Sequence, residues 1–123
     1  MKLHDSELKV MHVLWRYGET PAREIAEHLA QQVGWNINTS YTLIKRCMAK
    51  GAIERREPGF VCRALVECEK IRAEESRLFL EKLYDGSAEL LFVSMVQNGQ
   101  LSEVALSRLR SMMDEVLTDD GGG

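Results

Sequence analysis

One segment of this 123-residue chain carries most of the structural information; it reads NINTSYTLIKRCMAKGAIERREPGFVCR, from Asn36 to Arg63. In its first half, apolar residues recur at helical spacing up to Gly51, which predicts a helix over residues 37–50. Two short stretches, 53–57 and 60–65, then flank Pro58-Gly59, a pair that suits the two central positions of a tight type II turn. The segment therefore predicts a helix followed by a β-hairpin.

The predicted helix has two different faces. Its apolar residues can face a core, and they are Ile37, Tyr41, Leu43, Ile44, Cys47 and Met48. Its other side is short-polar and then basic, with Asn38, Thr39, Thr42, Lys45 and Arg46. Short polar side chains near a helix N-terminus can approach base edges, whereas longer cations reach phosphate or guanine. A solvated amphipathic helix shows the same pattern, so this helix alone leaves both interpretations open.

Two more helices precede this segment. Asp5 or Ser6 can cap the first, whose apolar stripe is Leu8, Met11, Leu14 and Trp15 and which Gly18 ends. Thr20 can cap the second, with Pro21 at its first position, a stripe of Ala22, Ile25, Ala26, Leu29 and Val33, and an end at Gly34. Three helices followed by a hairpin predict a mainly α fold, a winged helix-turn-helix, whose third helix enters the DNA major groove.

The charge distribution supports DNA as the partner. The whole chain has a net charge of −3, which argues against a nonspecific polycation. Residues 1–66 carry ten Lys and Arg against seven Asp and Glu, and residues 67–123 carry six against twelve. Within residues 35–66 there are six cations and two acids, so positive charge concentrates where the motif predicts contact.

These arguments give a set of expected contacts with double-stranded DNA. Base edges or the adjacent backbone are assigned to Asn38, Thr39, Tyr41 and Thr42. Phosphate anchors are Lys45, Arg46 and Lys50, and weaker contacts of the hairpin, or wing, are Arg55, Arg56 and Arg63. The rival interpretation is a winged helix used only for protein association.

The C-terminal half predicts a dimer. A charged helix from Glu67 to Tyr84, an apolar helix after Ser87 and a last helix after Ser102 offer too little interior for their own apolar residues. We therefore expect a homodimer that reads an inverted repeat, with an interface of Phe79, Leu83, Leu90, Leu91, Phe92, Met95, Val96, Leu106, Leu109 and Met113. Packing of these helices back on the winged helix is the alternative. The expected division is a DNA-binding domain at 1–66, a dimerisation region at 67–118 and a disordered tail at 119–123.

Other chemistries have weaker support. A nucleophile elbow, a P-loop, a dinucleotide fingerprint and a His-Glu-x-x-His motif are all missing from the sequence, so no enzyme, cofactor or small-molecule substrate is expected. An odd cysteine count without a secretory segment predicts reduced cytoplasmic thiols. Cys62 and Cys68 are close enough in sequence to meet, which leaves a thiol or metal sensor as an alternative, although unligated thiols are the commoner outcome. His4, His12 and His28 lie on separate helical segments without ligand spacing, so no metal site is expected.

The order of several motifs resembles the BlaI/MecI/CopY penicillinase-repressor family. They are Leu3-His4-Asp5-Ser6-Glu7-Leu8 with Leu14-Trp15, then Thr20 to Ala26, Thr39 to Arg46, Lys50-Gly51, and Leu101-Ser102 with Leu109-Arg110. The resemblance implies a dimeric bacterial repressor that blocks transcription of antibiotic-resistance or metal-homeostasis genes from an inverted-repeat operator. In the β-lactam branch it also implies a membrane receptor with a metalloprotease domain that triggers repressor cleavage.

The chain departs from that family's pattern at four places. His4 stands where Thr is frequent in the family, and this replacement is expected to move the cap of the first helix to Asp5. The wing tip at residues 59–62 is also short. Ser94-Met95 occupies the place of the Asn-Phe cleavage site, and the C-terminus lacks the paired Cys-x-Cys elements of copper-responsive members. The resemblance therefore leaves the inducing signal open.

Overall fold

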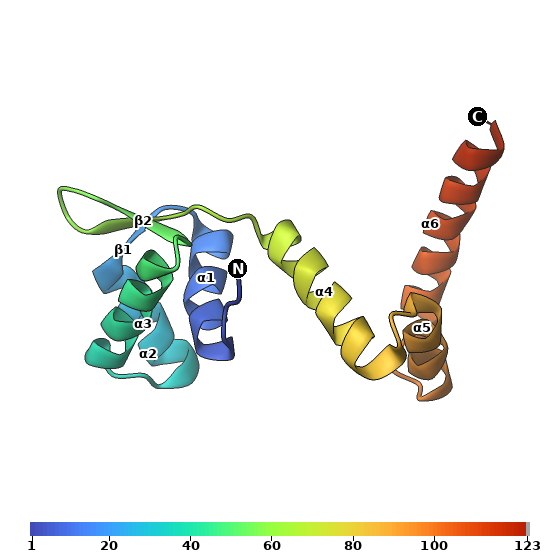
Figure 1. Cartoon of the computed structure of the whole chain (residues 1–123), viewed down its shortest axis with the longest axis horizontal. Coiled ribbons are helices and arrows are strands. Elements are labelled where there is room, and N and C mark those ends of the chain that lie inside the picture. Colours follow the sequence, from blue (N-terminus) through green and yellow to red (C-terminus); the bar gives the residue numbers. More distant parts are fainter. Residues whose placement is uncertain (123) are drawn as a thin grey trace. The chain divides into compact units, whose positions relative to one another are not determined.

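The computed structural model describes residues 1–122, the last three of them by backbone alone. Helices α1 (Asp5–Tyr17), α2 (Ala22–Val33) and α3 (Ile37–Ala49) come first (Figure 1). The short strands are β1 (Thr20–Pro21), β2 (Ile53–Arg56) and β3 (Val61–Ala64). Helices α4 (Cys68–Tyr84), α5 (Ala88–Gln97) and α6 (Glu103–Gly122) follow. Two compact units result, residues 1–74 and 75–123, and the division lies within α4 rather than at residue 66.

The three N-terminal helices enclose the core of the first unit. Its buried apolar residues come from α1, α2, α3 and the hairpin, among them Val10, Ile25, Ile44 and Cys62. Ile71 in the first turns of α4 packs against this cluster, and the Trp15 indole Nε1 donates to the Val66 carbonyl at 2.9 Å. These two contacts explain why the start of α4 belongs to the first unit.

The sheet contains a strand that the sequence did not predict. Its order is β1-β3-β2, both pairings are antiparallel, and Thr20 lies opposite Cys62. Thr20 as helix cap and Pro21 as first helical residue were therefore wrong, since α2 begins at Ala22 after Pro21. Long-range pairing with β3 sets this backbone, and the Ala22 amide donates to the Phe60 carbonyl at 2.9 Å.

Two further local predictions need correction. The cap of α1 is His4, not Asp5 or Ser6, and its backbone amide donates to Glu7 Oε1 at 2.7 Å. The hairpin is joined by the four residues 57–60 rather than a two-residue type II turn, because pairing ends at Arg56 and Val61. In that loop the Glu57–Pro58 peptide bond is cis, and both Gly59 and Phe60 have positive φ.

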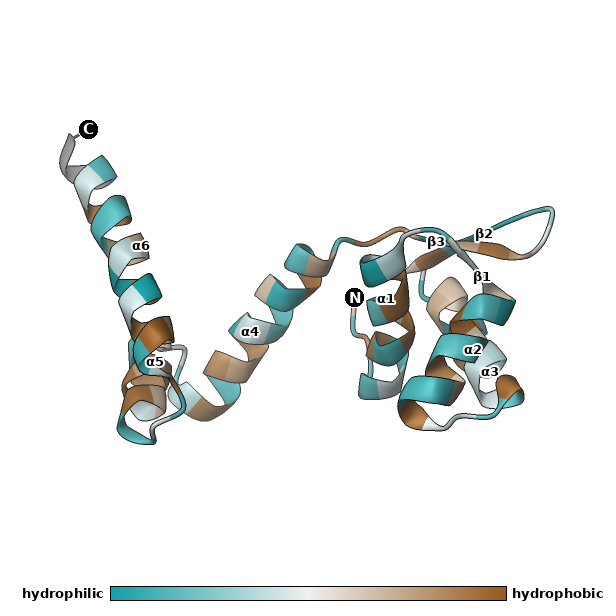
Figure 2. Cartoon of the chain, turned by 180° about the vertical axis from the view of Figure 1, so that it is seen from behind, coloured by the Kyte–Doolittle hydropathy of each residue, from teal (hydrophilic) through white to brown (hydrophobic). Residues whose placement is uncertain are grey.

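The second unit has no interior of its own among its described side chains. None of the side chains of residues 75–119 is buried. Figure 2 shows hydrophobic residues along α5 and on α6. Of the residues expected at a dimer interface, the exposed ones are Phe79, Leu83, Leu90, Phe92, Val96 and Met113, and the half-buried ones are Leu91, Met95, Leu106 and Leu109.

The expected disordered tail differs from the structure. Helix α6 continues through residues 119–122. Gly123 lies outside the described residues. Within the described part of the chain, no helix combines the length and the apolar composition that crossing a bilayer requires.

Candidate nucleic-acid interface

The exposed face of α3 presents a continuous row of polar groups. Its N-cap is Asn36, whose Oδ1 accepts from the Thr39 amide at 2.8 Å. The residues that line one shallow hollow along this face are Asn36, Asn38, Thr39, Thr42, Leu43 and Arg46. Lys45 is exposed on the same helix. Asn36 was missed as a site residue, although an Asn before a helical apolar pattern is itself a helix-start signal.

The hydroxyl of Thr42 has a defined role in this row. Its Oγ1 donates to the Asn38 carbonyl at 2.9 Å, one helical turn earlier. With its proton committed to that carbonyl, the exposed oxygen keeps only acceptor capacity for an outside group. Donors at base edges of the major groove are the amino groups of adenine and cytosine. In this geometry Thr42 presents an exposed acceptor of the kind that such donors pair with.

One residue of α3 lies elsewhere than expected. Ile37 is 62% exposed, so its assignment to the core was wrong. It is the first helical residue, and Ser40 instead fills the buried face beside Leu43, Ile44 and Cys47. The apolar periodicity assigned Ile37 to the core because Ile is hydrophobic. It could not show that the first residue of the helix lies beyond the core.

Tyr41 joins α3 to the wing. Its ring is half-buried and meets the Phe60 ring edge to face, with centroids 5.8 Å apart. Phe60 also carries the Arg55 guanidinium 3.7 Å above its ring centroid. Tyr41 therefore positions the hairpin against α3, and this packing leaves it less available for a base than Asn38 or Thr39.

Lys50 differs most from its expected role as a phosphate anchor. Its Nζ lies 2.6 Å from Glu7 Oε1 and 2.8 Å from the Lys2 carbonyl. The Glu7 side chain is only 2% exposed and that of Lys50 is 30% exposed. Burial by itself raises the pKa of Glu7, but hydrogen bonds from Lys50 and from the His4 amide outweigh it and hold the pKa below its usual value. Lys50 thus neutralises a buried carboxylate between α1 and α3.

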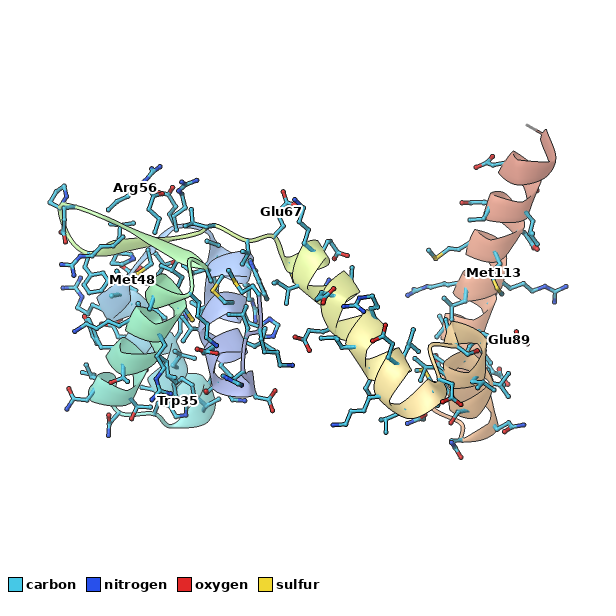
Figure 3. The ribbon with its side chains drawn as sticks, viewed as in Figure 1. Trp35, Met48, Arg56, Glu67, Glu89 and Met113 are labelled. Carbon is cyan, nitrogen blue, oxygen red and sulfur yellow. The ribbon has the colours of Figure 1, made fainter. Side chains whose placement is uncertain are left out.

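The wing arginines are also paired within the first unit. Arg63 Nε donates to Glu54 Oε2 at 2.8 Å, and Arg55 Nε donates to Glu57 Oε1. Arg56, which projects from the hairpin in Figure 3, lies 3.4 Å from Glu19 Oε1 and 3.6 Å from Glu54 Oε2. The sequence argument counted these cations and missed their partners, although opposite charges facing each other across a hairpin are a readable signal.

The structure disfavours the thiol or metal site considered for Cys62 and Cys68. Cys62 is buried in the core, where burial raises its thiol pKa to about 11. Burial likewise raises the pKa of Cys47 to about 12. Both thiols are therefore poor nucleophiles at neutral pH. Among the residues that the structure describes, no group of three His, Cys, Asp or Glu could hold a metal ion.

Known proteins match this chain along nearly its whole length. The model of the family described as "Penicillinase repressor" matches residues 3–115. The chain belongs to the penicillinase repressor family. This membership confirms the resemblance found in the sequence, and it places the chain among DNA-binding transcriptional repressors rather than enzymes.

Individual relatives agree with this assignment. The methicillin resistance regulatory protein MecI of Staphylococcus aureus (strain N315) is 29% identical over 116 residues, covering 93% of this chain and 94% of MecI. The penicillinase repressor of Bacillus licheniformis is 26% identical over 116 residues, covering 93% of this chain and 91% of its own.

Solved structures of relatives match a little more than half of this chain. The DNA-binding domain of the repressor BlaI superposes with a TM-score of 0.51 at 28% identity, over 55% of this chain and 84% of that domain. The monomeric form of Bacillus licheniformis BlaI, solved in complex with the blaP half-operator, gives 0.51 at 27% identity, over 56% and 87%. The winged-helix fold predicted from residues 1–66 is thus confirmed. A family of DNA-binding repressors also disfavours a winged helix used only for protein association.

Proposed function

We propose that this penicillinase-repressor family member acts as a homodimer that covers an inverted-repeat operator. The observation that carries the dimer is the second unit, where none of the described side chains of residues 75–119 is buried. Leu109, Met112, Met113, Val116 and Leu117 line an apolar hollow of about 430 Å³ along α6. An exposed apolar face of this extent marks an association surface, and a second copy of the same chain supplies a matching one.

In this proposal α3 of each subunit enters the major groove. Asn38, Thr39 and Thr42 take the base edges, and Lys45 and Arg46 take the phosphates. The B. licheniformis BlaI half-operator complex supports DNA binding by one such module, because that monomeric protein was solved in complex with half of an operator. Two such modules on one duplex bind with a high effective concentration that a single module lacks. An operator with two-fold symmetry follows from the symmetry of the dimer.

Two measurements test the proposal. Light scattering on the purified chain at micromolar concentration should give twice the mass of the 123-residue chain, and a monomer would refute the dimer. Selection from a random duplex pool should enrich two inverted half-sites whose centres lie one helical turn, about 10 bp, or a multiple of it apart. Enrichment of a single unrepeated site would refute the proposal that a dimer binds two half-sites.

The controlled genes are proposed to serve antibiotic resistance or metal homeostasis. The names of the MecI and penicillinase-repressor relatives favour resistance. Induction by a membrane metalloprotease receptor would require cleavage at a bond other than Asn-Phe, since Ser94-Met95 occupies that region of α5. Deletion of the gene followed by transcript profiling should raise a small set of neighbouring transcripts. An unchanged profile would reject the repressor role at those genes.

A further inference from the structure

The wing carries three arginines, and each of them contacts a carboxylate of the first unit. The contacts are Arg63 with Glu54, Arg55 with Glu57, and Arg56 with both Glu19 and Glu54. Residues 53–63 contain three arginines and two glutamates, so most of the positive charge of the wing is neutralised by the wing itself. The two exposed cations of α3 differ, because Lys45 and Arg46 have no carboxylate partner among the described residues.

We propose that Glu54 and Glu57 reduce the sequence-independent affinity for DNA, because they form ion pairs with the arginines of the wing. The inference rests on the proposed function and on the expected contact of the wing arginines with the DNA backbone. A DNA phosphate that binds a wing arginine must either displace Glu54 or Glu57 from the guanidinium or bind beside that carboxylate, which repels it. In either arrangement the net gain from a wing arginine is smaller than that from Arg46 of α3.

The geometry of the hairpin keeps these pairs in place. Glu54 lies directly opposite Arg63 in the register of β2 and β3, so the strand pairing itself sets their separation. Glu57 is held from two sides, because its Oε2 accepts from the Phe60 amide at 3.1 Å while Oε1 accepts from Arg55. The ring of Phe60 lies under the same Arg55 guanidinium. Arg55 is therefore fixed by a carboxylate and by an aromatic face together.

The pKa values of both glutamates agree with this arrangement. The hydrogen bond from Arg63 is the main cause that lowers the pKa of Glu54. The pKa of Glu57 is lowered first by the Phe60 amide and then by Arg55. Both carboxylates are therefore charged at neutral pH, so that they repel phosphate as well as bind arginine.

The test compares the full chain with the variant Glu54→Gln/Glu57→Gln on a random-sequence duplex and on the selected operator. We expect the variant to bind both duplexes about 3–10-fold more tightly at about 50 mM salt. The slope of log affinity against log salt concentration should steepen by about 1–2 for each subunit, since one or two further phosphate contacts form. Both duplexes should gain alike, because phosphate contacts carry no sequence information.

Two controls separate pairing from general charge. Glu69→Gln/Glu81→Gln removes the same two charges from exposed arginine pairs on α4, and it should change affinity by less than about twofold. The gain from Glu57→Gln should also disappear when Arg55→Gln is already present, because no paired guanidinium remains to be released.

The outcomes that overturn the inference are defined. An unchanged affinity for Glu54→Gln/Glu57→Gln, with operator binding by the wild type intact, rejects the inference and leaves the proposed function standing. An equal gain for Glu69→Gln/Glu81→Gln also rejects it, since net charge alone would then explain the effect. Loss of salt-dependent DNA binding in the wild type itself would reject the proposed function.

Discussion

The substitution Lys50→Met tests whether this lysine stabilises the fold or contacts DNA. The Lys50 ammonium lies 2.6 Å from a Glu7 carboxylate that is 2% exposed. Removing one partner of a fully buried ion pair destabilises a protein by about 3–5 kcal/mol, because the other charge stays buried and unpaired. Lys50 is 30% exposed and the His4 amide still donates to Glu7, so we expect the lower end, about 3 kcal/mol.

The assay is urea denaturation at one fixed protein concentration, since the stability of a dimer depends on concentration. Lys9→Met on α1 is the matched control, an exposed lysine whose loss should change stability by less than about 0.5 kcal/mol. The variant Glu7→Gln/Lys50→Met should recover about half of the loss, because a neutral amide replaces the unpaired charge. A stable Lys50→Met variant with weakened DNA binding would refute this reasoning and restore Lys50 as a phosphate anchor.

The pH dependence of the stability of Lys50→Met is an independent test of the Glu7–Lys50 ion pair. In the wild type the pKa of Glu7 lies below its ordinary value of 4.5, so its contribution to stability is present above that pH and is lost as the pH falls through the folded-state pKa. In Lys50→Met the pKa of Glu7 should be higher than in the wild type, because the hydrogen bond and the charge of Lys50 that lower it are gone while burial still raises it. The stability difference between the two proteins should therefore narrow from pH 7 to about pH 4. A constant difference would contradict the buried pair.

Three further predictions concern the DNA face, the dimer and the thiols. Thr42→Ala should reduce discrimination between the operator and a scrambled duplex by about 1–3 kcal/mol, whereas Arg46→Ala should weaken both duplexes alike in filter binding or anisotropy. Equal losses for Thr42→Ala on the two duplexes would contradict its assigned role. Met113→Lys should shift light scattering towards the monomer, because it places a charge on the apolar face of α6. One thiol per chain, that of Cys68, should react with a disulfide reagent at pH 8, since the other two are buried; three reacting thiols in the folded protein would contradict this.

The sequence predicted the first unit well where local rules and the fold agree. Gly18 and Gly34 end α1 and α2, and the stripes of Leu14, Ile25 and Leu29 lie in the core as their spacing predicted. The sequence failed at Thr20-Pro21, where cap preferences describe one residue and its next three neighbours. Pairing with a strand some forty residues away decides that backbone, and no local rule contains it.

The sequence predicted which residues share the polar face of α3, but it did not predict which of the cations form ion pairs. Asn38, Thr39, Thr42 and Arg46 are exposed on one face, because helical spacing alone determines which residues share it. Lys50 belongs to the same basic cluster by sequence, yet its partner Glu7 lies on another helix. Only the packing of α1 on α3 distinguishes a lysine that neutralises a buried acid from one that reaches phosphate.

Pairing also changes what the local charge means for DNA recognition. Residues 35–66 carry six cations, of which Lys50 and the three wing arginines contact carboxylates in the structure. Lys45 and Arg46 remain, and both lie on α3 beside the polar groups that can read bases. In the proposed complex, electrostatic attraction is strongest beside the proposed base contacts, so a mismatched duplex gains little from the wing. Discrimination then depends on the fit of α3 in the groove, and the release of wing arginines should raise affinity without improving that fit.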